Sequence, residues 1–234
     1  MPSLPTVILD FHPRISPAPL SPFCMLELFI SAFITLFVVI DPVGVMPMFA
    51  ALTQGAERAY RRRMAFKGTL ISFLILAFFA LTGDGLLNLL HISLEAFRIA
   101  GGILLFFVAI DMVLVRSSGL SSTTTRETQE AEHRQDISVF PLAIPLIAGP
   151  GAITSMILLT GGGENRWQSV IVVLIVMALV LGLNWILLLI SNRLVKLIGV
   201  TGAGVISRVL GILLAALAVQ FVLDGLSATF QQIS

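Results

Sequence analysis

Residues 167–192 form a run of 26 without a charged side chain, and this run limits the possible folds more than any other feature. About 20 apolar residues in a helix cross the roughly 30 Å of hydrocarbon in a bilayer. Apolar residues make up 57% of the chain and charged residues only 12%, against about 25% charged in soluble proteins. The sequence therefore predicts a protein of the lipid bilayer, with no nucleic acid as a partner.

Six segments are long and apolar enough to span a membrane: 26–53, 66–90, 97–115, 138–160, 167–190 and 205–227. We expect an all-α integral membrane protein with three helices in residues 25–115 and three in 138–234. Residues 116–137 are rich in charge and predict a polar cytoplasmic linker. Residues 1–24 hold six of the eleven prolines. They form a flexible extension, or they are untranslated because translation starts at Met25.

The basic residues are distributed unequally between the two sides of the membrane. Eleven of them fall in the connections after the first, third and fifth segments, and three fall on the other side. Short loops rich in Lys and Arg stay in the cytoplasm. We therefore expect a multi-pass protein of the bacterial cytoplasmic (inner) membrane with both termini on the periplasmic side.

The two halves of the chain resemble each other. Gly102-Ile103-Leu104-Leu105 recurs 109 residues later as Gly211-Ile212-Leu213-Leu214, and Asp41-Pro42-Val43-Gly44 aligns with Gly149-Pro150-Gly151-Ala152 at nearly the same offset. Three spans per half would insert the second half upside down, which is the inverted repeat of many secondary transporters. The alternative is a chance match between leucine-rich and isoleucine-rich segments.

Proline and glycine interrupt the first and fourth spans. Asp41, Pro42 and Gly44 precede Pro47 in the first, and the fourth contains Pro141 and Pro145 before Gly149, Pro150 and Gly151. Proline removes a backbone donor and glycine allows unwinding, so both spans are predicted to be broken. Unwound backbone at membrane depth lines protein or a polar cavity. Asp41, Pro42, Gly44, Gly149, Pro150 and Gly151 are therefore the predicted substrate-binding residues, unless the breaks are simple proline kinks.

Four further polar residues are coupling or binding candidates beside Asp41. Asp41 binds a cation, a proton or a substrate ammonium group, or only caps the following half-helix. Asp111 and Gln220 occupy equivalent positions in the predicted repeat. Asp111 either takes part in coupling or has only a solvated or capping role. Gln220 lies deeper in its span and needs hydrogen-bond partners there. Arg98 and Arg208 either reach a substrate carboxylate or anchor helix ends at the interface.

Metal and redox chemistry have no support in the sequence. Cys24 is the single cysteine, and the three histidines have no ligand spacing. No cofactor is expected. Thr82-Gly83-Asp84-Gly85 is only loosely similar to the Gly-Asp motif of aspartyl intramembrane proteases, and Asp84 lies near the outer end of its span, so we do not expect an enzyme.

Several motifs together resemble the MarC family of multi-pass inner-membrane proteins. They are Asp41-Pro42 with Gly44 and Pro47, Arg98-Ile99-Ala100-Gly101-Gly102, Phe140-Pro141-Leu142-Ala143-Ile144-Pro145 before Ala148-Gly149-Pro150-Gly151, and Ser207-Arg208 before Gly211. The resemblance covers about residues 25–226 and implies six spans with external termini. Some relatives look like ion-driven transporters of small neutral amino acids. The resemblance carries over no site residues.

The leading hypothesis is a secondary transporter or exporter of a small zwitterionic metabolite, such as a neutral amino acid, by alternating access. The substrate would move with a coupled proton or sodium ion. The alternative is a non-transporting membrane component, an assembly factor or sensor that uses residues 116–137 as its binding surface. A homo-oligomer is compatible with the small-residue helix faces.

Overall fold

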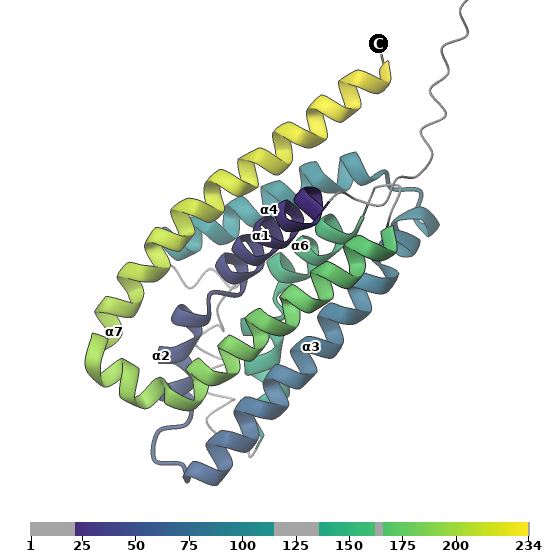
Figure 1. Cartoon of the computed structure of the whole chain (residues 1–234). Coiled ribbons are helices and arrows are strands. Elements are labelled where there is room, and N and C mark those ends of the chain that lie inside the picture. The colour runs from purple at the N-terminus through teal and green to yellow at the C-terminus, as the bar shows by residue number, and fades with distance from the viewer. Residues whose placement is uncertain (1–21, 115–135, 162–165, 234) are drawn as a thin grey trace, which may run out of the picture.

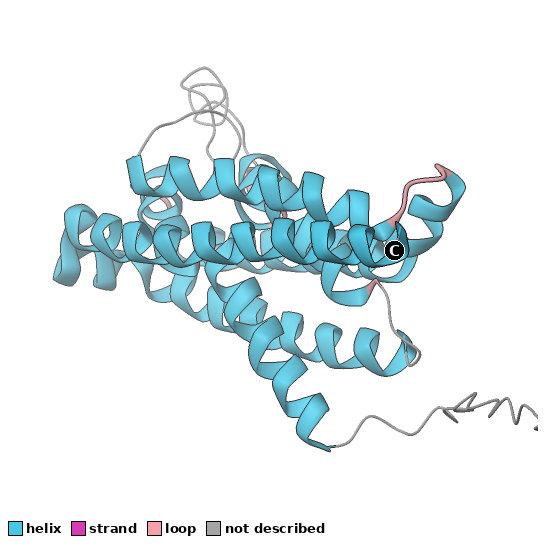
Figure 2. Ribbon diagram, turned by 90° about the horizontal axis from the view of Figure 1, so that it is seen from above, coloured by secondary structure: helices cyan, strands magenta, loops and turns pink. Residues whose placement is uncertain are grey.

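The described residues are almost entirely helical (Figures 1 and 2). The computed structural model describes residues 22–114, 136–161 and 166–233, and no strand occurs among them. The predicted all-α class is therefore confirmed. Residues 1–21 of the predicted extension and 116–135 of the predicted linker lie outside the described residues.

Four helices form the N-terminal half: α1 (Pro22–Ile40), α2 (Pro42–Leu52), α3 (Arg58–Leu89) and α4 (Leu94–Leu114). Asp41 alone separates α1 from α2. The first turn of α4 is stabilised by the Ser93 hydroxyl, which accepts a hydrogen bond from the Ala96 amide at 3.1 Å. α3 starts eight residues before the predicted span, so the basic cluster Arg58–Arg63 is helical because the helix continues beyond its apolar part.

The C-terminal half contains η1 (Ser138–Ile147), α6 (Pro150–Thr160) and α7 (Arg166–Ile233). η1 is irregular because Phe140 and Ile144 have extended backbone angles, and each precedes a proline. α7 is helical on both sides of Gly199, whose φ of 76° and ψ of 164° interrupt it. The ribbon of α7 turns back on itself along its length (Figure 1). Residues 191–204, the expected connection between two spans, are therefore helical apart from this one residue.

Four helical segments among the described residues are long and apolar enough to cross a membrane: Met25–Leu52, Arg58–Leu89, Leu94–Leu114 and Arg166–Gln231. The pair η1 and α6, bent by 57°, makes a fifth if it counts as one span. The structure thus establishes four or five apolar spanning segments. The predicted fifth and sixth spans both lie within α7.

Two apolar clusters hold the bundle together. The larger one joins α1, α2, α3, η1, α6 and the first part of α7 around Phe49 and Met177, which are fully buried. The smaller one joins α1 and α4 to the last part of α7, through Leu105 and Leu214. Large apolar side chains also cover the outside, such as Leu74, which is 59% exposed. That surface suits contact with lipid.

Candidate functional site

Asp41 forms the break between α1 and α2. Its backbone is left-handed, with φ 45° and ψ 64°, and its carboxylate accepts a hydrogen bond from the Gly44 amide at 3.0 Å. Pro42 occupies the first helical position, where its missing amide costs nothing. Asp41 is thus the N-cap of α2, and Asp is one of the few residue types that tolerates a left-handed backbone. The capping role is present in the structure, and it leaves the second carboxylate oxygen free for other contacts.

Ser207 lies beside this carboxylate, although it is 166 residues away in the sequence. A Cβ built on Gly44 would collide with Asp41 Oδ2 and would lie 2.6 Å from Ser207 Oγ. The absence of a side chain at Gly44 therefore leaves the space in which the carboxylate and the hydroxyl meet. Ser207 is buried in α7. Sequence reasoning did not select it, although it stood in the Ser207-Arg208 motif.

The second break lies between η1 and α6, at Gly149-Pro150-Gly151. Gly149 is the N-cap of α6 and Pro150 its first residue, and no side chain caps this helix. Gly151 packs closely on other elements: a Cβ on it would lie 3.2 Å from Leu105 Cδ2 and 3.4 Å from Val39 Cγ1. Val39 precedes Asp41 by two residues, so the α6 N-terminus lies against the end of α1.

A small cavity of about 20 Å³ lies beside the second break. Its walls come from α1, α4, η1 and α6, and they include Val39, Pro145, Gly149 and Gly151. A volume of about 10–15 Å³ suffices for one water molecule. In this conformation the cavity is therefore too small for an amino acid.

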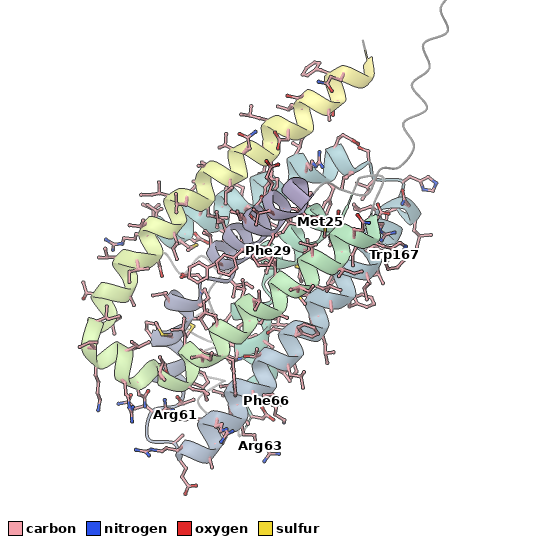
Figure 3. The ribbon with its side chains drawn as sticks, in the orientation of Figure 1. Met25, Phe29, Arg61, Arg63, Phe66 and Trp167 are labelled. Atoms are coloured by element: carbon pink, nitrogen blue, oxygen red, sulfur yellow. The ribbon has the colours of Figure 1, made fainter. Side chains whose placement is uncertain are left out.

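The two half-helices that begin at the breaks have the same design. α2 and α6 each contain 11 residues and each start with proline. α2 leads to the end of the bundle that carries Arg61, and α6 leads towards Trp167 at the opposite end (Figure 3). A helix N-terminus carries partial positive charge and free amides. The N-terminus of α2 is neutralised by Asp41, whereas that of α6 has no side-chain cap.

The other predicted polar residues lie elsewhere. Gln220 is exposed on α7 and donates a hydrogen bond to Asp224 Oδ1 at 2.7 Å. Both residues therefore lie on the same exposed face of α7. Arg208 is exposed, although its neighbour Ser207 faces Asp41. Arg98 packs against Gly225 of α7, and Asp111 is partly buried near the end of α4. None of these four has a recorded contact with Asp41 among the described residues.

Three buried polar side chains were not assigned to the site. Ser155, Asn184 and Ser191 are fully buried, and their polar atoms have no hydrogen-bond partner within the described part of the chain. Buried polar atoms almost always have partners, so these positions suit water or a polar ligand. The one signal in the sequence is a polar residue inside an apolar run.

Metal ligands do not gather in the described residues. No group of three His, Cys, Asp or Glu side chains lies close enough together there to hold an ion. Asp84 forms an ion pair with Arg166 at 3.2 Å near the end of α3. The structure brings Asp41 and Ser207 together at the first break, and the N-terminus of α6, which has no side-chain cap, forms the second break.

Known proteins resemble nearly the whole chain. Residues 26–230 match the family described as MarC family integral membrane protein. A UPF0056 membrane protein of Archaeoglobus fulgidus is 39% identical over 202 residues, covering 86% of this chain and 93% of the relative. UPF0056 membrane protein YvbG of Bacillus subtilis is 36% identical, covering 88% and 97%. YhcE of Escherichia coli is 35% identical, covering 85% and 91%. No solved structure matches the chain. Together with its apolar spanning helices, these matches show that the chain belongs to the MarC family of multi-pass integral membrane proteins.

Proposed function

We propose that this protein is a secondary transporter or exporter of a small zwitterionic metabolite, such as a neutral amino acid, which works by alternating access in the cytoplasmic membrane. One observation carries the proposal. Two half-helices of equal length start at neighbouring breaks, with a carboxylate at one break and a small cavity beside the other. Secondary transporters place their substrate sites at such breaks near the bilayer midplane.

The chemistry at the breaks suits both ends of a zwitterion. The uncapped N-terminus of α6 offers free amides and partial positive charge to a substrate carboxylate. Asp41 and Ser207 offer oxygen atoms to an ammonium group, a proton or a sodium ion. Because the volume of the cavity suffices for only about one water molecule, binding requires α1 and α6 to move apart. An enzymatic role is not part of the proposal, since Asp84 is engaged by Arg166.

An inverted repeat of six spans is part of the same proposal. It is supported by reciprocal contacts: a Cβ on Gly102 would lie 2.7 Å from Ala218 O, and one on Gly211 would lie 3.2 Å from Ala109 O. The repeat offset of 109 residues maps Gly102 onto Gly211 and Ala109 onto Ala218. A two-fold axis between the halves would produce this pair of contacts. In this proposal the parts of α7 before and after Gly199 are the fifth and sixth crossings, which the interruption at Gly199 supports.

Substitution of Asp41 by Asn separates capping from charge. Asn caps helices as well as Asp and also tolerates a left-handed backbone, so α2 keeps its start. A thermal-shift screen against neutral amino acids at two pH values would identify the ligand by the stabilisation that binding produces. Uptake of that ligand into proteoliposomes would then be measured under an imposed proton or sodium gradient.

We expect Asp41→Asn to abolish gradient-driven uptake with an unchanged thermal midpoint in the absence of ligand. Asp224→Asn is the matched control, since it removes a carboxylate from an exposed face of α7 and should transport normally. Normal uptake in Asp41→Asn would remove Asp41 from the mechanism. Failure of the wild-type protein to bind or transport any zwitterion would refute the proposed substrate class.

A further inference from the structure

A second and much larger pocket lies at the end of the bundle that carries Arg61, away from the helix breaks (Figure 3). Its volume is about 680 Å³. Five of its lining residues are basic, and none is acidic: Arg58, Arg61, Arg62, Arg193 and Lys196. The first three belong to the start of α3 and the last two to the middle of α7. Tertiary packing thus brings together two basic clusters that are about 130 residues apart.

These five cations have no anionic partner within the described residues. The ion pairs recorded there join other residues, Lys67 with Asp136 and Arg166 with Asp84. Like charges that line one hollow repel each other and create a positive potential inside it. A bound anion would relieve this repulsion.

Arg61 supplies a second, independent sign of a missing partner. Its Nε atom is buried and has no hydrogen-bond acceptor among the described residues. A buried donor without an acceptor is costly, so such atoms almost always have a partner. The guanidinium group binds phosphate oxygens in a two-pronged geometry that ammonium groups cannot provide. A phosphate oxygen in the pocket would meet this requirement.

The other wall of the pocket is apolar and lies at the membrane boundary. Leu188, Leu189 and Ile190 line it, and Ile190 is 38% exposed. The uncharged run of α7 ends two residues later, at Asn192, directly before Arg193. The pocket therefore spans the level at which the acyl chains of a lipid meet its headgroup. A soluble anion would make no use of the apolar wall.

We propose that this pocket binds the phosphate group of an anionic phospholipid, with the lipid chains along Leu189 and Ile190. Basic pockets between membrane helices on the cytoplasmic side are suited to anionic headgroups. The bound lipid would join the start of α3 to the turn of α7. The proposal is independent of transport, because the pocket shares no lining residue with the cavity at the helix breaks.

The test measures the thermal unfolding midpoint of the full chain in neutral detergent with three probes. These are phosphatidylglycerol, phosphatidylcholine with the same acyl chains, and inorganic phosphate at matched ionic strength. We expect phosphatidylglycerol to raise the midpoint in a saturable way, and phosphatidylcholine to leave it unchanged. Arg193→Gln and Lys196→Gln, both at exposed positions, should each lower the apparent affinity roughly fivefold.

Arg63→Gln is the matched control, because it removes an exposed charge from the same end of α3 but outside the pocket lining. It should bind phosphatidylglycerol like the wild-type protein. An equal rise with inorganic phosphate would keep the anion site but overturn the lipid as its occupant. No rise with phosphatidylglycerol or with inorganic phosphate, or an equal loss of affinity in Arg63→Gln, would overturn the pocket itself.

Discussion

At Asp41 a single side chain starts a helix and also faces a residue from the other half of the chain. The carboxylate accepts from the Gly44 amide through Oδ1, while Ser207 lies on the side of Oδ2. The left-handed backbone of Asp41 is uncommon for any residue other than glycine, and strained positions of this kind are enriched at functional sites. Local capping and long-range contact thus coexist at one residue.

Gly44 should tolerate no side chain, because a Cβ there would lie 2.6 Å from Ser207 Oγ and would collide with Asp41 Oδ2. In Gly44→Ala the carboxylate must turn away and α2 loses its cap, which costs about 0.5–2 kcal/mol. We expect a lower thermal midpoint and a weaker ligand-induced shift. Gly204→Ala is the control, since a Cβ at Gly204 meets nothing within 4 Å. Equal behaviour of the two variants would contradict the crowded geometry at Asp41.

Asp136 provides a pH-dependent contact next to η1. Lys67 Nζ lies 2.7 Å from its carboxylate, and the Ser138 amide and hydroxyl also donate to it. These contacts, with Lys67 the largest cause, lower the pKa of Asp136 from 3.8 to about 2. Folding therefore favours the charged form of Asp136. The contribution of this carboxylate to the free energy of unfolding is present above about pH 4 and is lost as the pH falls towards 2.

The difference in unfolding free energy between the wild-type protein and Asp136→Asn should therefore shrink between pH 4 and 2. We expect this difference to be less than about 1 kcal/mol at pH 7, because the side chains of Lys67 and Asp136 are both nearly half exposed and solvent screens their ion pair. Unfolding followed by circular dichroism at several pH values checks this. Lys67→Gln should reproduce most of the effect, and a difference that persists at pH 2 would rule out this ion pair as its source.

At the scale of elements, glycines set how closely α4 approaches the last part of α7. The contacts of Gly102 with Ala218 and of Gly211 with Ala109 and Met112 run in opposite directions along the two segments, so these are antiparallel. Glycine permits close backbone approach where lipid supplies no hydrophobic driving force between helices. The fully buried Leu105 and Leu214 complete the contact.

Alanine at either glycine should separate these helices. A Cβ on Gly102 would lie 2.7 Å from a backbone oxygen, which cannot rotate away as a side chain would. Overpacking of this kind costs about 1–3 kcal/mol. We expect Gly102→Ala and Gly211→Ala each to lower the unfolding midpoint in detergent, whereas Gly182→Ala, with open space around its Cβ, should not. Unchanged midpoints in both variants would show that the helices do not approach this closely.

The whole molecule has two distinct ends, with the basic pocket at one and Trp167 at the other (Figure 3). The connection between α2 and α3 lies at the basic end. α3 is 32 residues long, so the connection between α3 and α4 lies at the opposite end. The bias of Lys and Arg predicts that the basic end lies in the cytoplasm. That orientation is testable because Cys24 is the only cysteine.

Cysteine labelling checks the orientation. In a Cys24→Ser background, Gln54→Cys and Ile92→Cys place one thiol in each of these two connections, both at exposed positions. We expect a membrane-impermeant maleimide to label intact spheroplasts at position 92 only, and to label position 54 after permeabilisation. The reverse pattern would invert the topology and would place the basic pocket outside the cell.

The sequence by itself determined the membrane class, the helical fold and the two breaks. These depend on local physics: an uncharged run long enough to span hydrocarbon, and prolines and glycines that end helices wherever they occur. It also located Asp41 as the carboxylate at a break. Even so, it missed the continuation of α7 to Gly199, because hydropathy ends the span before the charged residues Arg193 and Lys196, whereas the helix continues past them.

Only the tertiary structure decided which polar residues meet. Ser207 and Arg208 are adjacent in the sequence, yet one faces Asp41 and the other is exposed. Gln220, which the predicted repeat aligns with Asp111, bonds to Asp224 on an exposed face. The basic pocket likewise joins Arg61 to Arg193. Such contacts depend on how whole helices rotate and pack, and neither hydropathy nor helix propensity encodes that rotation between distant segments.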